Sequence, residues 1–121
     1  MLTSEFANHF AQEWVEAWNA HDLERILSHY TDDFQMTSPL IVSLMGIPEG
    51  TIKGKAGVGD YWGKALARNP NLHFELKAVT FSLNSIALYY ENTDRKSHTI
   101  EWFLFNSDGK CVQSIGHYEH V

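Results

Sequence analysis

The chain has 121 residues, 44% of them hydrophobic and 13% aromatic, and its formal charge is −6. This length predicts one domain over residues 1–121 with a sizeable buried core. Nine scattered basic residues against fifteen acidic ones argue against nucleic acid or an anionic membrane as a partner, because phosphate binding needs clustered positive charge. No apolar run approaches the ~20 residues of a membrane span, and one cysteine with an acidic amino terminus predicts a cytoplasmic protein.

Apolar residues at helical spacing predict three helices. The first covers residues 3–20 and carries an aromatic stripe. Asp22 is expected to cap the second, over residues 23–30. The third covers residues 55–69. The aromatic stripe of the first helix consists of Phe6, Phe10, Trp14 and Trp18.

Strand-like alternation replaces the helical spacing elsewhere. Short turns between consecutive strands favour antiparallel pairing, so the predicted class is α+β, a meander sheet with helices on one face. Residues 40–53 are predicted to be an irregular, apolar connection, either a lid over a cavity or a dimer contact. The predicted strands are residues 34–38, 72–83, 86–92, 98–106 and 111–120.

Two adjacent acids, Asp32 and Asp33, stand between the second helix and the first strand. Asp commonly occupies turns, so we interpret both as turn residues. Neighbouring residues on a strand point to opposite faces, and the two carboxylates could not serve one catalytic site there.

Five short motifs follow one another along most of the chain. They are Trp18-Asn19 with Asp22-Leu23, YTDDF at 30–34, GKAGVGDYW at 54–62, LHFEL at 72–76 and DGKCVQSIGHY at 108–118. In this order the chain resembles the SnoaL-like branch of the nuclear transport factor 2-like superfamily, which includes ketosteroid isomerase-like and polyketide cyclase-like proteins.

The resemblance implies a conical, cystatin-like α+β barrel. In it, three N-terminal helices pack on a strongly curved, mixed or antiparallel sheet and enclose an apolar cavity. It also implies a homodimer formed through the outer face of the sheet. It implies no single activity, because the superfamily includes isomerases, cyclases, dehydratases, hydrolases and binding proteins.

The strand over residues 98–106 is apolar on both faces, so alternation leaves its orientation open. If Glu101 points inward with its alternate neighbours, it is an acid in an aromatic cavity. Desolvation would then raise its pKa and make it a candidate general acid or base. If Ile100 and Trp102 point inward instead, Glu101 lies at the rim or at a dimer surface.

His117 and Tyr118 are adjacent on the last strand, so one of them faces inward. Ser114 and Gly116 share the side of Tyr118 and leave room there. Tyr118 is therefore the second catalytic candidate, a hydrogen-bond donor to a carbonyl or enolate oxygen. His117 is retained as a candidate ligand-binding residue. The other predicted lining residues are Trp14, Trp18, Tyr30, Met36, Ser38, Trp62 and Tyr90.

Metal and cofactor motifs were not found. The seven histidines lack an HExxH spacing, Cys111 has no CxxC partner, and residues 54–59 lack the Lys-Ser/Thr of a phosphate-binding loop, so we expect no metal or cofactor. The prediction is a homodimeric protein that binds a small apolar or aromatic molecule. It is either a cofactor-free isomerase, cyclase or lyase using acid-base chemistry, or a non-enzymatic ligand-binding or protein-interaction module.

Overall fold

The computed structural model describes residues 1–120, which form four helices and six strands. The helices are α1 (Ser4–Asn19), α2 (Leu23–Leu27), α3 (Pro39–Met45) and α4 (Lys55–Arg68). The strands are β1 (Tyr30–Thr37), β2 (Thr51–Lys53), β3 (Phe74–Phe81), β4 (Ser85–Asn92), β5 (Ser97–Phe105) and β6 (Cys111–Tyr118). The predicted α+β class is confirmed.

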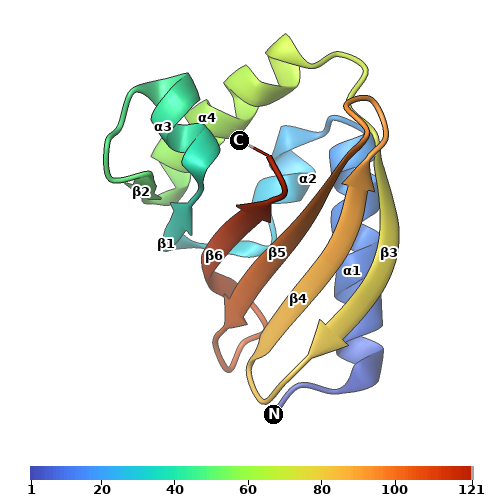
Figure 1. Cartoon of the computed structure of the whole chain (residues 1–121). Coiled ribbons are helices and arrows are strands. Elements are labelled where there is room, and N and C mark those ends of the chain that lie inside the picture. The colour runs from blue at the N-terminus through green and yellow to red at the C-terminus, as the bar shows by residue number, and fades with distance from the viewer. Residues whose placement is uncertain (121) are drawn as a thin grey trace.

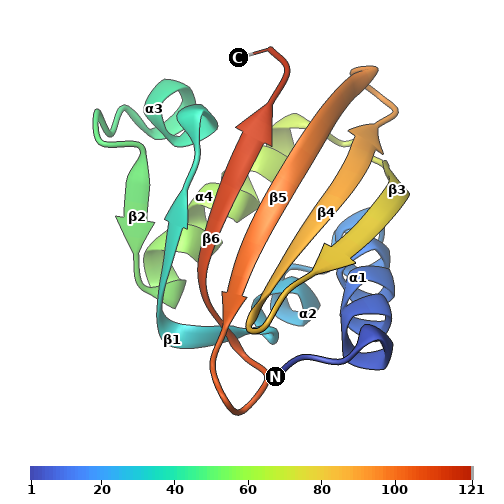
Figure 2. The same cartoon turned by 60° about the horizontal axis from the view of Figure 1, so that its bottom comes forward.

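The six strands form one mixed sheet in the order β2-β1-β6-β5-β4-β3 (Figure 2). Neighbouring strands pair antiparallel except β1 and β6, which are parallel. The sheet curls strongly but does not close, since β2 and β3 remain as its two edges. The strands from β3 to β6 are the predicted meander, and β1 joins it on the side of β6.

Helices cover one face of the curled sheet (Figures 1 and 2). α1 packs on β3 and α4 packs on β1. α1 buries the predicted aromatic stripe apart from Phe6, which is partly buried against the core. Within residues 1–120, no helix lies on the opposite face of the sheet (Figures 1 and 2). The core therefore lies between the concave face of the sheet and the helices.

Local capping explains where two of the helices begin. The hydroxyl of Thr3 accepts a hydrogen bond from the backbone N–H of Phe6 at 3.1 Å and caps α1. The carboxylate of Asp22 accepts one from the N–H of Arg25 at 3.2 Å, so the predicted cap of α2 is confirmed.

The irregular connection predicted over residues 40–53 is wrong. It contains α3 and β2, so the chain has four helices rather than three within residues 1–120. Ser38 caps α3, and Pro39 lies in the first turn of the helix. A proline is tolerated there because backbone N–H groups in the first turn have no partner within the helix. Gly46 ends the helix in the left-handed conformation, with φ of 68°.

The transition from α2 to β1 also differs from the prediction. The helix ends at Leu27 and the strand begins at Tyr30, so Asp32 and Asp33 lie inside β1 rather than in a turn. Both side chains are exposed, at a place where the pairing of β1 with β6 shifts register. Within residues 1–120, no helix is long and apolar enough to cross a bilayer.

Candidate functional site

The orientation of β5 places one acid inside the protein. Glu101 is 4% exposed, and Phe103 and Phe105 are buried on the same side of the strand. Ile100, on the opposite side, is 46% exposed. Phe10 and Trp14 of α1 meet the Phe103 ring edge-on, so the helix-covered face is the one to which Glu101 belongs.

Both carboxylate oxygens of Glu101 accept a hydrogen bond from a neighbouring strand. The hydroxyl of Ser114 on β6 donates to Oε2 at 2.8 Å. The hydroxyl of Tyr90 on β4 donates to Oε1 at 3.3 Å. Because Tyr90 and Ser114 are buried as well, these two bonds fix the direction in which the carboxylate points.

Burial controls the proton affinity of this group. Desolvation raises the pKa of Glu101 from 4.5 to about 7, and the bonds from Ser114 and Tyr90 oppose the rise. Near neutral pH the side chain therefore populates both its acid and its base form, as a group that takes up and returns a proton requires.

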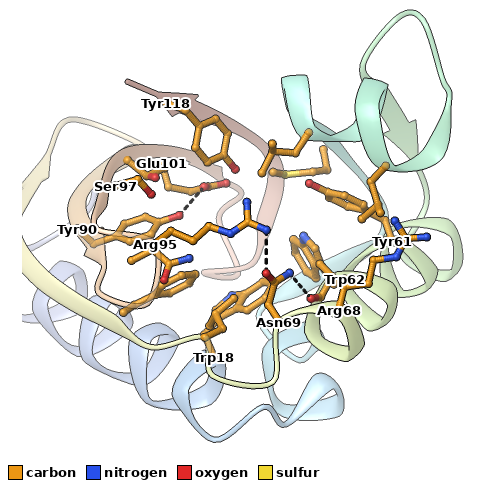
Figure 3. A pocket seen from close by; sticks show the side chains of 18 of the residues that line it. Trp18, Tyr61, Trp62, Arg68, Asn69, Tyr90, Arg95, Ser97, Glu101 and Tyr118 are labelled. Atoms are coloured by element: carbon orange, nitrogen blue, oxygen red, sulfur yellow. Dashed lines mark hydrogen bonds between the residues drawn. The ribbon is translucent and has the colours of Figure 1, made fainter. Parts of the chain in front are cut away.

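Gly116 makes room for Tyr118 beside this carboxylate. Gly116 lies opposite Glu101 in the pairing of β5 and β6. A Cβ atom at Gly116 would lie 3.0 Å from the Tyr118 hydroxyl, so the tyrosine side chain folds over the glycine. The structure thus places Tyr118 on the side of the sheet that carries Glu101, as Figure 3 shows.

A second hydroxyl cluster surrounds Ser38, at the end of β1. The Ser38 hydroxyl donates to the Tyr118 hydroxyl at 3.5 Å and accepts from the backbone N–H of Leu40 as the cap of α3. Burial raises the pKa of Tyr61 on α4 to about 12, and a hydrogen bond with Ser38 opposes that shift. Burial also raises the pKa of Tyr118, so both phenols remain protonated donors at neutral pH.

These groups line a cavity of about 340 Å³ between the sheet, α1, α3 and α4 (Figure 3). Seven of its lining residues are Trp, Tyr or Phe, and Trp14 stacks on Phe74 with ring centroids 5.6 Å apart. The inner end is polar around Glu101, and the outer end carries exposed basic side chains. The lining residues are Trp14, Trp18, Met36, Leu40, Ser43, Leu44, Tyr61, Trp62, Ala65, Arg68, Asn69, Leu72, Phe74, Tyr90, Asn92, Arg95, Ser97, Thr99, Glu101, Tyr118 and His120.

Most of the predicted site residues meet in this cavity. Ser38 contacts it through the Tyr118 hydroxyl. Tyr30 does not line it, because its ring is buried in the core and its hydroxyl accepts from the indole N–H of Trp14 at 3.1 Å. The predicted residues that line the cavity are Trp14, Trp18, Met36, Trp62, Tyr90, Glu101 and Tyr118.

The placement of His117 in the ligand site is wrong. His117 is exposed on the outer face of the sheet, in a shallow apolar depression with Ile100, Trp102 and Ile115. The physical reason is strand alternation. Gly116 and Tyr118 on β6 face the interior, so His117, which lies between them, faces outward.

Sequence reasoning missed several residues of the cavity. Tyr61 directly precedes Trp62 in a helical pattern, and Ser114 shares the strand parity of Tyr118, so local signals existed for both. Arg68 and Arg95 had no such signal, because their approach depends on the packing of the β4–β5 turn against the end of α4.

The alternatives for residues 40–53 are partly resolved by α3. Leu40, Ser43 and Leu44 line the cavity, so this helix forms part of its wall. Among residues 1–120, no group of three or more His, Cys, Asp or Glu side chains is arranged to hold a metal ion.

The chain is similar to known proteins of the same fold. A model of the SnoaL-like domain family matches residues 11–114. A SnoaL-like protein of unknown function from Burkholderia thailandensis E264 is 45% identical, with 96% of each chain covered and a TM-score of 0.92. No curated protein matches the chain.

Two more distant solved structures are also similar. AclR from Streptomyces galilaeus, proposed to be a hydroxylase, is 20% identical, with 97% of this chain and 77% of that chain covered and a TM-score of 0.73. A protein from Kribbella flavida DSM 17836, proposed to be a ketosteroid isomerase, is 12% identical, with 97% and 80% covered and a TM-score of 0.73. At this level of identity the likeness shows the fold alone.

Proposed function

The chain belongs to the SnoaL-like domain family, and from that premise we propose that it binds a small aromatic or apolar molecule in the cavity and transfers a proton on it through Glu101. The observation that carries the proposal is a buried carboxyl group, hydrogen-bonded on both oxygens, at the inner end of a cavity with aromatic walls. Such an arrangement combines a general acid-base group with an apolar binding site.

The proposed reaction is proton transfer next to a carbonyl group. The ionised Glu101 carboxylate takes a proton from the carbon beside the carbonyl. The electron pair of the broken C–H bond forms a carbon–carbon double bond, and the π pair of the carbonyl moves onto its oxygen to give an enolate. Tyr118 donates a hydrogen bond to that oxygen as its negative charge develops. Protonated Glu101 then returns the proton to the same carbon or to a conjugated one, which gives exchange or isomerisation.

Tyr90 and Ser114 act in this scheme as positioning residues. Their hydroxyls hold Glu101 in one orientation and stabilise its ionised form, while burial stabilises its neutral form. The balance keeps the pKa of Glu101 at about 7, where abstraction and return of a proton are both accessible.

Exchange of a simple ketone tests the proposal without knowledge of the natural substrate. The methyl protons of 2-acetylnaphthalene are acidic, and their replacement by deuterium in heavy water is followed by NMR. We expect the protein to accelerate this exchange and Glu101→Gln to reduce the acceleration by about 10²-fold or more. Tyr118→Phe should reduce it as well, through loss of one donor to the oxyanion.

Glu24→Gln provides the matched control, because Glu24 is an exposed glutamate in the first turn of α2. This variant should exchange the ketone like the wild type. Binding of 2-acetylnaphthalene without acceleration of exchange would contradict proton transfer and favour the non-enzymatic ligand-binding alternative. Equal acceleration by wild type and Glu101→Gln would remove Glu101 from the mechanism.

The outer face of the sheet supports a further proposal, that two copies of the chain form a homodimer through it. Trp102, Ile115 and Ile100 lie together there, and Tyr89 on β4 is 40% exposed. Within residues 1–120 no helix covers these side chains, and a second copy would bury them.

A further inference from the structure

Two arginines stand at the open end of the cavity. Arg95 comes from the turn between β4 and β5, and Arg68 from the last turn of α4. Both side chains are exposed and both line the cavity. The third arginine of the chain, Arg25, is paired with Glu13 and Glu16 and does not line the cavity.

Arg95 is held across the opening by a neutral partner. Its Nη2 donates to Oδ1 of Asn69 at 2.8 Å, and Nδ2 of Asn69 donates to the carbonyl of Ala65 at 2.7 Å (Figure 3). Asn69 therefore links the β4–β5 turn to the end of α4. Because an amide holds the guanidinium where a carboxylate could have done so, the positive charge is positioned without being neutralised.

The arginines at the mouth of the cavity and the acid at its inner end do not pair with each other. Within residues 1–120, neither Arg68 nor Arg95 forms an ion pair with a carboxylate. Glu101, the acid at the inner end, is instead bonded to Tyr90 and Ser114. The cavity thus has a cationic mouth, aromatic walls and an acid-base group at its inner end.

On the basis of the function proposed above, we infer that the ligand is an aromatic or apolar carboxylate whose anionic group binds Arg95 at the mouth. A guanidinium offers several N–H donors in one plane and matches a carboxylate well, and only one of these donors contacts Asn69. A carboxylate would be disfavoured at the inner end, where it would be desolvated beside ionised Glu101. Arg68 contributes a second positive charge at the same opening.

This arrangement fixes the direction of the bound ligand. With its carboxylate at Arg95, the opposite end of an extended aromatic molecule points toward Glu101 and Tyr118. The arginine contact therefore presents the reacting carbonyl to the acid-base group, and it selects ligands that carry charge and carbonyl at opposite ends.

Two probes of the same shape, one charged and one neutral, test the inference. We would compare 6-acetyl-2-naphthoate with 6-acetyl-2-naphthamide by isothermal titration calorimetry at low ionic strength and at a pH of about 8, where the acid is ionised. The wild type should bind the carboxylate about tenfold more tightly or better. Arg95→Met should remove most of this preference by weakening binding of the carboxylate far more than binding of the amide, and Arg68→Met should reduce the preference by less.

Lys96→Met is the matched control. Lys96 is the next residue in the same turn, is exposed, and does not line the cavity, so this variant loses the same charge nearby. It should retain the preference for the carboxylate. If Lys96→Met and Arg95→Met weaken carboxylate binding equally, the effect is general charge attraction and the inference is overturned.

The remaining outcomes separate this inference from the proposed function. Equal binding of acid and amide by the wild type overturns the carboxylate inference alone. Selective, Arg95-dependent binding of the acid, with ketone-methyl exchange unaffected by Glu101→Gln, supports the inference and contradicts the proposed proton transfer. Failure of both probes to bind contradicts both proposals.

Discussion

Glu101 shows at the scale of a single residue how burial raises the pKa of a carboxyl group at the expense of stability. The unfolded chain loses its proton near pH 4.5, whereas the folded chain keeps it to a pH of about 7. Between these values the folded state binds more protons, so the contribution of Glu101 to the free energy of unfolding falls as pH rises.

Replacement of Glu101 by Gln removes this pH dependence. We expect Glu101→Gln to gain about 3 kcal/mol of stability relative to wild type as pH rises from about 4 to about 8. Urea unfolding of both proteins across this range measures the difference, in which the titration of all other groups cancels. Glu24→Gln should show no such trend. A constant difference between wild type and Glu101→Gln would contradict a raised pKa for Glu101.

Gly116 provides a steric prediction at the same scale. In Gly116→Ala the new methyl group would lie 3.0 Å from the Tyr118 hydroxyl, so the tyrosine must move away from Ser38. We expect a loss of about 1 to 2 kcal/mol in the free energy of unfolding. In a Tyr118→Ala background the same substitution should lose much less, because the clash is gone. Equal losses in both backgrounds would contradict the contact.

At the scale of elements, one side chain joins α1 to the edge of the sheet. Asn19, the last residue of α1, donates from Nδ2 to the carbonyl of Phe74 at 3.0 Å and accepts from the N–H of Phe74 at 2.7 Å. Asn19 thereby satisfies the N–H and the carbonyl of Phe74, which lie on the unpaired side of the edge strand β3. The contact positions Trp18 and Phe74, two walls of the cavity, relative to each other.

Asn19→Ala should therefore destabilise the protein by about 1 to 3 kcal/mol, because the buried groups of Phe74 lose both partners. Chemical denaturation measures this loss. Asn8→Ala is the control, since Asn8 is exposed on the same helix and donates only to the carbonyl of Ser4. A loss for Asn19→Ala no larger than for Asn8→Ala would argue against the tie between α1 and β3.

The elements differ in how far the sequence determines them. Long periodic segments such as α1 and α4 were predicted within one or two residues, because their spacing records which face is buried. α3 was missed although Ser38, Pro39 and Gly46 are ordinary cap residues, since a seven-residue helix offers little periodicity. The orientation of β5 could not be predicted, because both of its faces are apolar and only the helices decide which is the interior.

The residues of the candidate site also differ in how far the sequence predicts them. Alternation leaves the orientation of Glu101 open, whereas Tyr118 and four of the aromatic walls follow from strand parity and helical stripes. The basic mouth does not, because Arg95 reaches it through a turn and is fixed by Asn69 from a distant segment. Contacts of this kind leave no local pattern in the sequence.

At the scale of the whole molecule, the curled sheet separates two surfaces of different character. Its concave face encloses the cavity, and its outer face carries the exposed Ile100 beside the half-buried Trp102 and Ile115. We expect the protein to sediment as a dimer and Trp102→Glu to sediment as a monomer, because a charge would be buried in the interface.

Phe81→Glu is the control for this experiment. Phe81 is an exposed aromatic residue at the end of β3, outside the outer-face depression, and its replacement should leave the dimer intact. A wild-type protein that sediments as a monomer would contradict the proposed interface. Loss of the dimer in both variants would place the interface elsewhere.

The ionisation of Glu101 is the quantity on which the proposed chemistry depends most directly. It can be followed by NMR of protein containing ¹³C-labelled glutamate, with the Glu101 signal assigned by its disappearance in Glu101→Gln. The account predicts a titration midpoint at a pH of about 7. A midpoint near 4.5 would show a solvated carboxylate and would contradict a role for Glu101 as the acid-base group of a buried site.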